Sequence, residues 1–164
     1  MRTIIHDLDE KELQEIHFKK NDQIISSLNC KNSCIGCFSC WIKHPMECAI
    51  KDEYSKIVES IKYSDELIII SKNRYGCYSN NTKRVLERCI GYVLPYFTIR
   101  EGKTHHKSRY NTPVPLIVYF YGDFDKEDKK CLKELVKANA INLSSPKYTI
   151  NFLDNIAEVD KCIQ

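Results

Sequence analysis

Residues 54–71 of the chain read Y-S-K-I-V-E-S-I-K-Y-S-D-E-L-I-I-I-S, and this stretch decides the fold class. Its first half places Tyr54, Ile57 and Ile61 at helical spacing, which predicts an amphipathic helix. Its second half, residues 67–71, is an unbroken apolar run of strand length. Such a strand is typical of a parallel sheet that is covered on both faces. The stretch therefore predicts a helix followed by a buried parallel strand.

The same alternation of elements continues in both directions along the chain. Periodicity predicts strands at 3–6, 23–28 and 116–121, a short core strand at 140–143 and an edge strand at 148–152. Alternating helices and apolar strands predict an α/β fold, a three-layer sandwich around a parallel sheet. The remaining predicted helices are a short one with Leu13 and Ile16, one with Val85, Leu86, Cys89, Ile90 and Val93 that ends near Pro95, one with Leu132, Leu135 and Val136, and a closing one with Ile156, Val159 and Ile163.

Length and charge set limits on the protein class. The 164 residues predict a single domain over 1–164 with a core of its own. Because 25 basic side chains stand against 22 acidic ones, with a net charge of +3, the composition does not indicate binding to nucleic acid. The chain holds no apolar run of membrane-spanning length, and its first residues, M-R-T-I-I-H-D-L-D-E, turn acidic where a signal peptide stays apolar. We therefore expect a cytoplasmic protein without a membrane partner.

Cysteine is the unusual residue of this composition, with nine in the chain and five of them in a cysteine-rich loop at about 29–50. In a reducing compartment such a group is typical of a metal or redox site. Cys34, Cys37 and Cys40 recur every three residues and Cys48 follows, a spacing that favours a [4Fe-4S] cluster over zinc. The residues alone leave two alternatives open, thiols that simply pack in a loop and a dithiol that opens and closes.

The other cysteines lack this spacing and are interpreted as core or surface thiols. They are Cys30, Cys77, Cys89, Cys131 and Cys162.

Several ordered motifs between Cys34 and Arg88 carry a family resemblance. They are C-x-G-C-x-x-C-W, P-x-x-C-x-I-K-D-E-Y, S-D-E-L-I-I-I and Y-G-x-x-S-x-x-x-K-x-x-x-E-R, and they span about a third of the chain. In this order they resemble the NADPH-dependent FMN reductase and iron–sulfur flavoprotein group of the flavodoxin-like superfamily. The resemblance implies a five-stranded parallel sheet of order 2-1-3-4-5, FMN at its carboxyl edge and electron transfer between NAD(P)H, flavin and an acceptor. It also implies that Cys34, Cys37, Cys40 and Cys48 hold a [4Fe-4S] cluster.

The resemblance also implies which residues bind the flavin. The loop after the third strand would hold the ring, and the next loop along the sheet would contact the ring's other edge. Gly76 lets backbone N–H groups approach a ligand, and Tyr75 offers a ring for stacking. The residues alone equally describe an ordinary strand-to-helix turn. The implied cofactor-binding residues are Asn73, Arg74, Tyr75, Gly76, Ser79, Lys83, Gly122 and Asp123.

The first loop departs from the pattern of the group. Where its members place hydroxyl-rich residues around the FMN phosphate, this chain has H-D-L-D-E-K-E-L at residues 6–13. The acidic side chains Asp7, Asp9 and Glu10 would repel a phosphate. Other groups therefore hold the phosphate, or the ligand differs, or the flavin site has been lost.

The basic segment at 102–110, G-K-T-H-H-K-S-R-Y, is a candidate replacement for the phosphate loop. Its lysines and arginine can donate to a phosphate, and imidazole side chains such as those of His105 and His106 can serve as proton donors. We therefore consider the two histidines as candidate catalytic proton donors. The alternative is a solvated basic loop.

These observations predict a flavin-dependent oxidoreductase or electron carrier that uses FMN and NAD(P)H, with a [4Fe-4S] cluster as a further cofactor. The alternative is a non-enzymatic redox- or metal-sensing module that has lost FMN binding, and a thiol-packed or zinc-bound structural domain is a third reading. The expected partners are a small-molecule or protein electron acceptor and a second copy of the chain in a homo-oligomer.

Overall fold

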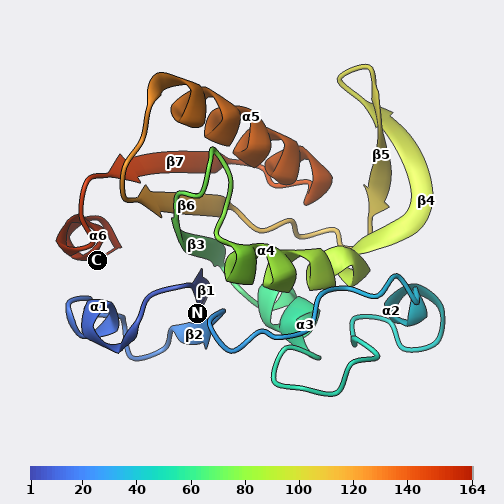
Figure 1. The fold of residues 1–164 in the computed structure, drawn as a ribbon. Coiled ribbons are helices and arrows are strands. Elements are labelled where there is room, and N and C mark those ends of the chain that lie inside the picture. Colours follow the sequence, from blue (N-terminus) through green and yellow to red (C-terminus); the bar gives the residue numbers. More distant parts are fainter. Residues whose placement is uncertain (164) are drawn as a thin grey trace.

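The computed structural model describes residues 1–163, and their central element is a parallel sheet (Figure 1). Within these residues the sheet has five strands in the order β2-β1-β3-β6-β7. This order is consistent with the flavodoxin-like sheet that the resemblance implies. The strands are β1 (Arg2–His6), β2 (Gln23–Ser26), β3 (Glu66–Lys72), β6 (Leu116–Tyr121) and β7 (Tyr148–Leu153).

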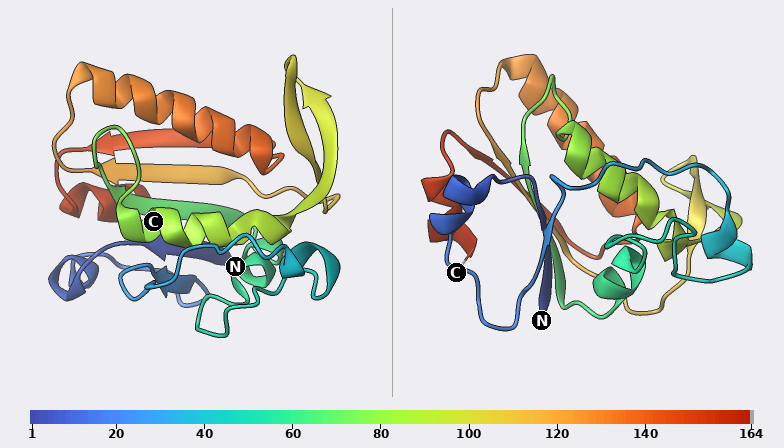
Figure 2. Two further views of the ribbon diagram at one scale, coloured as in Figure 1. Left: turned by 45° about the vertical axis from the view of Figure 1, so that its right-hand side comes forward. Right: turned by 60° about the horizontal axis from the view of Figure 1, so that its bottom comes forward.

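Helices cover both faces of the sheet (Figure 2). On one face the sheet packs against α3, α4, the 3₁₀ helix η1 and α5, and on the other against α6 and the segment around α1. None of the helices in the described residues has the length and apolar character that crossing a membrane requires. The helices are α1 (Glu10–Gln14), α2 (Ser39–Ile42), α3 (Ile57–Lys62), α4 (Asn80–Glu87), η1 (Arg88–Tyr92), α5 (Lys126–Asn142) and α6 (Ala157–Ile163).

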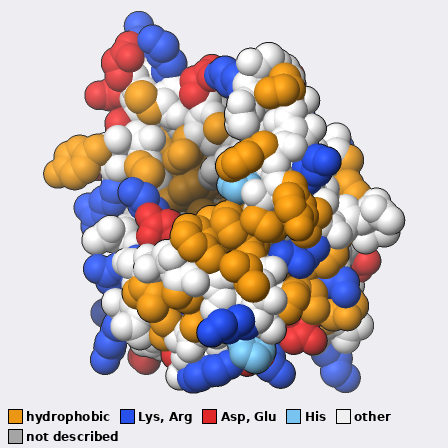
Figure 3. All heavy atoms as spheres, turned by 90° about the vertical axis from the view of Figure 1, so that its right-hand side faces the viewer, with side chains coloured by type: hydrophobic (Ala, Val, Ile, Leu, Met, Phe, Trp, Pro, Cys, Tyr) orange, Lys and Arg blue, Asp and Glu red, His pale blue; other side chains and the backbone are white. Residues whose placement is uncertain are grey.

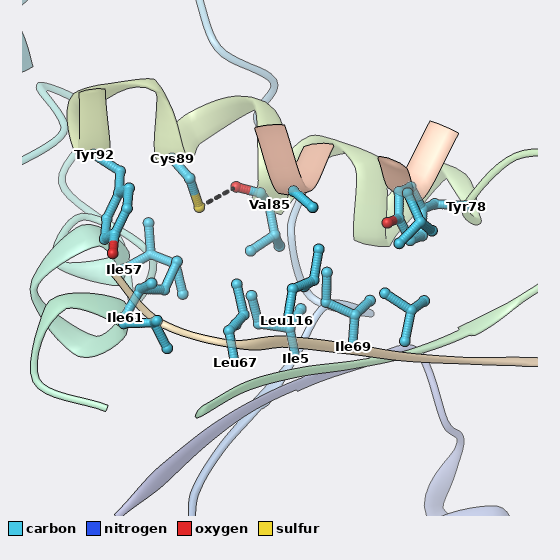
Figure 4. Close-up of a cluster of buried hydrophobic side chains, with 14 of the residues drawn as sticks. Ile5, Ile57, Ile61, Leu67, Ile69, Tyr78, Val85, Cys89, Tyr92 and Leu116 are labelled. Atoms are coloured by element: carbon cyan, nitrogen blue, oxygen red, sulfur yellow. Dashed lines mark hydrogen bonds between the residues drawn. The ribbon is translucent and has the colours of Figure 1, made fainter. Parts of the chain in front are cut away.

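The apolar run that predicted a buried strand forms β3. Ile68 and Ile70 face the α6 side of the sheet, while Leu67 and Ile69 face α3 and α4. All four side chains are at most 1% exposed, because alternate residues of a central strand point to opposite covered faces. Figure 4 shows Leu67 and Ile69 directed toward the helix layer, where Cys89 donates from Sγ to the Val85 carbonyl at 3.3 Å.

A hairpin that the sequence did not predict follows η1. β4 (Val93–Arg100) and β5 (Lys103–Ser108) pair antiparallel in a separate two-stranded sheet in the described residues. Their two-residue turn, Glu101 and Gly102, has positive φ at both positions, which suits the right-handed twist of a hairpin. Figure 1 shows the hairpin at one end of the sheet.

Two predicted elements were wrong. The helix expected to run to Pro95 ends as α4 at Glu87 and continues only as η1, and Pro95 lies inside β4. The strand expected at 140–143 belongs to the end of α5, where Ala140 extends the buried i, i+4 series of that helix. A short, mainly apolar segment of this length does not distinguish a strand from the last turn of a helix.

The sheet has two functionally different ends. The strands end at what we call the carboxyl edge, where the loops after β1, β3 and β6 lie. Helices α4 and α5 start at this edge and run back along the sheet (Figure 1). The first residues of β3 and β6, η1 and the β4–β5 hairpin define the opposite amino end.

Candidate functional site

The carboxyl edge is the usual ligand position in an open parallel sheet, at the point where the strand order reverses. In this sheet the reversal lies between β1 and β3, and Asp7 follows β1 there. Its carboxylate accepts hydrogen bonds from Ser71 Oγ at 3.1 Å, from the Lys72 backbone N–H at 3.0 Å and from the Tyr121 hydroxyl at 3.1 Å. Asp7 is only 7% exposed. A side chain of the chain itself thus occupies the donors that this edge offers to an anion.

The start of α1 is equally closed to a phosphate. Asp9 caps the helix by accepting from the backbone N–H groups of Lys11 and Glu12, and Glu12 returns a hydrogen bond to the backbone of Asp9. This capping box uses the N–H groups that an anion could have bound. With acidic side chains in the first turn of α1 and its N–H groups capped, the loop after β1 does not fit the phosphate of FMN.

The loop after β3 is tied to the start of α5. Asn73 Nδ2 donates to the Asp123 carbonyl and to Asp128 Oδ2, both at 2.7 Å, and Asn73 Oδ1 accepts from the Gly76 N–H. Gly76 has φ +70°, and a Cβ at this position would lie 2.9 Å from Cβ of Cys131. The loops after β3 and β6 therefore meet, and their polar groups bind each other.

The remaining residues that the resemblance assigns to the flavin lie around the contact between Asn73 and the start of α5. Tyr75 also has a positive φ, and its side chain is 99% exposed at the tip of the loop. Ser79 caps α4, and Lys83 lies 4.0 Å from Glu87 in an exposed ion pair. Tyr75 is thus the side chain at this edge whose ring is open to a ligand. Arg74 and Gly122 lie in the same two loops.

The cysteine-rich loop lies at the amino end of the sheet, away from the flavin loop. Cys34 borders the same cavity as Leu67 and Leu116, which lie at the starts of β3 and β6. Trp41 Nε1 donates to the Ile90 carbonyl at 2.9 Å, which fastens α2 to η1. The chain leaves β2 at the carboxyl edge but crosses the helix layer before the motif begins (Figure 1).

The four motif cysteines, Cys34, Cys37, Cys40 and Cys48, lie near one another but do not form a compact group. Burial raises the pKa of Cys40, and the charges of Cys34, Cys48 and Cys37 raise it further, so all three sulfurs lie within its electrostatic range. Among the described residues, however, no three His, Cys, Asp or Glu side chains are close enough to hold a metal ion. Four thiolates are the right ligand type for an iron–sulfur cluster, but their sulfur atoms are not arranged around a common centre. The [4Fe-4S] cluster stays a prediction from spacing and resemblance.

Arg88, the last residue of the stretch that carries the family resemblance, is buried and anchors a distant segment of the chain. Its guanidinium donates two hydrogen bonds of 2.6 Å to Asp52 and one of 3.2 Å to the Ile50 carbonyl. These hydrogen bonds hold the pKa of Asp52 below its usual value. The interaction fastens the segment that follows the cysteine-rich loop to η1. Sequence position could not reveal it, because the partner lies 36 residues away.

The two histidines of the basic segment also lie at the amino end. His106 donates from Nδ1 to the Leu94 carbonyl at 2.8 Å, and its ring packs 5.0 Å from that of Trp41. His105 Nδ1 is 2.8 Å from Asn142 Oδ1 at the end of α5. The segment forms β5, so it does not approach the loop after β1 and does not replace the phosphate site.

A cavity of about 490 Å³ opens at this amino end. Figure 3, which views the molecule from that end, shows a hollow lined by hydrophobic side chains. The lining comes from α3, β3, α4, η1, β4, β5, β6, the end of α5 and the cysteine-rich loop. Its residues are Cys34, Ile61, Leu67, Ile69, Leu86, Glu87, Cys89, Ile90, Val93, His106, Leu116, Asn139, Asn142 and Leu143.

Comparison with known proteins defines the fold class. A solved structure, an FMN-dependent NADH-azoreductase from Bacillus anthracis str. Ames Ancestor in complex with FMN, matches with a TM-score of 0.53. The match covers 99% of this chain and 89% of that chain at 13% sequence identity. No family model and no curated protein match the sequence. The likeness, together with the sheet order, shows that the chain has a flavodoxin-like fold.

Proposed function

We propose that the protein is a flavin-dependent oxidoreductase that transfers electrons from NAD(P)H to an acceptor. The observation that carries the proposal is the fold, which matches an FMN-dependent NADH-azoreductase over 99% of the chain. When bound, a flavin supplies the hydride and electron chemistry, and the protein supplies binding and electrostatics.

The structure limits how a flavin is recognised. FMN differs from riboflavin by a phosphate, and the loop after β1 presents a carboxylate that is already bound by its neighbours. A dianionic phosphate beside Asp7 would be repelled at close range. The proposed enzyme therefore recognises the flavin by its ring and not by its phosphate.

The test compares riboflavin and FMN by equilibrium titration of the purified protein. Flavin fluorescence and the visible spectrum report binding. We expect FMN to bind no more tightly than riboflavin, because its phosphate meets a carboxylate and gains no cation. Reduction of the bound flavin by NADH or NADPH would then show oxidoreductase activity. A strong preference for FMN would contradict the argument from Asp7, and no binding of any flavin would contradict the proposed function.

One observation favours a second candidate function. The hydrogen bonds of Asp7 close the position that an anionic cofactor uses in parallel sheets. A redox-sensing module that has lost its flavin and keeps the cysteine-rich loop has this arrangement. A colourless protein that binds no flavin but changes its free-thiol content on mild oxidation would support this candidate.

A further inference from the structure

We propose that the cavity at the amino end is a binding site for a neutral, planar, redox-active ring, either an isoalloxazine without its phosphate or a naphthoquinone. The inference rests on the proposed function and extends it, because it places the redox ligand at the end of the sheet opposite the usual one.

The size and walls of the cavity suit such a ring. Its volume of about 490 Å³ lies within the range of small-molecule sites, roughly 300–1,000 Å³. Leu67, Ile69 and Leu116 line it from the sheet side, and Figure 4 shows them directed toward the helix layer. Aliphatic side chains on a flat sheet surface favour a flat apolar ligand over a branched polar one.

The charge of the lining excludes an anionic ligand. Among the described residues that line the cavity, lysine and arginine are absent, and the ionised side chain is Glu87. A phosphate placed here would lose its hydration without gaining a cation. The cavity thus selects a neutral ligand, in agreement with the closed phosphate position at the carboxyl edge.

Three polar side chains on the cavity wall can direct a ring with carbonyl or imide edges. Because His106 donates from Nδ1 to a backbone carbonyl, Nε2 of the neutral ring is an acceptor. Asn139 donates from Nδ2 to the Tyr78 hydroxyl, which leaves its Oδ1 to accept from a ligand. Asn142 accepts from His105 through Oδ1, which leaves its NH₂ group to donate. The wall therefore offers both acceptors and a donor.

The cysteine-rich loop forms one wall of this cavity. Cys34 lines it directly, and Trp41 of the same loop packs 5.0 Å from the ring of His106. A redox-active ring in the cavity would therefore lie beside the thiols with the most distinctive spacing in the sequence. This contiguity points to a redox ligand more than to a structural lipid or a metabolite without redox chemistry.

The experiment uses the full chain and two neutral probes, lumiflavin and menadione. Trp41 is the chain's only tryptophan and contacts a cavity residue, so quenching of its fluorescence reports occupancy without an activity assay. Leu143→Phe fills the cavity from the end of α5, and we expect it to weaken binding about tenfold. Tyr75→Ala alters the competing site at the carboxyl edge. Tyr63→Ala, at an exposed position outside both sites, is the matched control and should leave both affinities unchanged.

His106→Gln is a second cavity variant, on β5 rather than at the end of a core helix. We expect it to weaken binding about threefold or more, because glutamine lacks the aromatic ring and does not hold an acceptor at the position of Nε2. Circular dichroism verifies that each variant is folded. If Tyr75→Ala abolishes binding while Leu143→Phe and His106→Gln leave it unchanged, the inference is overturned and the proposed function remains intact. Binding of menadione alone, lost in the cavity variants, would support the site and contradict a flavin function. If neither probe binds, the inference fails.

Discussion

Removal of the Arg88 guanidinium should destabilise the protein more than its position at a helix end suggests. The Arg88 side chain is fully buried, whereas that of Asp52 is 26% exposed. Breaking a buried ion pair by removing one partner costs about 3–5 kcal/mol, because the other charge remains without compensation. Since Asp52 retains some contact with water, we expect Arg88→Met to cost about 3 kcal/mol, near the lower limit of that range.

Urea denaturation at pH 7 measures this loss, with Asp52→Asn and the double variant completing a double-mutant cycle. For a chain of this size a loss of about 3 kcal/mol corresponds to a fall in Tm of roughly 6–12 °C. We expect a coupling energy between the two side chains of about 2 kcal/mol.

The pH dependence of this coupling gives a second check. The pKa of Asp52 is lowered in the folded state by the hydrogen bonds from Arg88, while Arg88 stays charged throughout. The contribution of the pair is therefore complete above the unfolded pKa of about 3.9 and is lost as the pH falls through the folded-state pKa. A coupling energy below about 0.5 kcal/mol at pH 7, or one that persists in strong acid, would refute the reasoning.

Three further predictions concern the core and the loops. Burial lowers the pKa of His6, whose Nδ1 accepts a hydrogen bond from a backbone N–H. The wild type should therefore lose stability as the pH falls through about 6.5, the unfolded pKa of histidine, whereas His6→Asn should lack this loss. Urea denaturation at pH 7 and pH 5 measures the difference. Gly76→Ala should be more destabilising than Gly36→Ala by about 1–3 kcal/mol, because both have positive φ but only Gly76 abuts Cys131; equal losses in chemical denaturation would show that the contact yields. Leu132→Ala, at a fully buried position of α5, should cost about 2–5 kcal/mol, and a change under 1 kcal/mol by thermal unfolding would argue against its place in the core.

The sequence predicted the sheet because its strands carry a local signal. Residues 67–71 and 116–121 are apolar on both faces, so burial between two helix layers follows from the residues themselves. The hairpin escaped prediction because Val93, at the start of β4, was assigned to a helix that ended near Pro95. In the structure Phe97 and Ile99 are exposed, and a strand that faces solvent gives no core signal.

The candidate site was predictable only in part, for a similar reason. The acidic character of the loop after β1 is a local property, so the sequence alone predicts that this loop repels a phosphate. The partners of Asp7 lie 64 and 114 positions away, so the sequence did not show that its carboxylate is buried and bound. His106 lies beside Trp41 because the hairpin brings it there, so this contact could not be predicted without predicting the hairpin first.

The β4–β5 hairpin has a consequence for how this protein can change over evolutionary time. It lies within the connection from β3 to β6, and in the described residues its strands pair only with each other. The entropy of closing a connection rises slowly with length, by about 0.6 kcal/mol for each doubling. Part of its attachment, through Arg100 and Arg109, is to backbone carbonyls, whose positions do not depend on side-chain identity. The hairpin can therefore be shortened, extended or exchanged among descendants while the sheet remains, and one end of the molecule can acquire new ligand preferences independently of the fold.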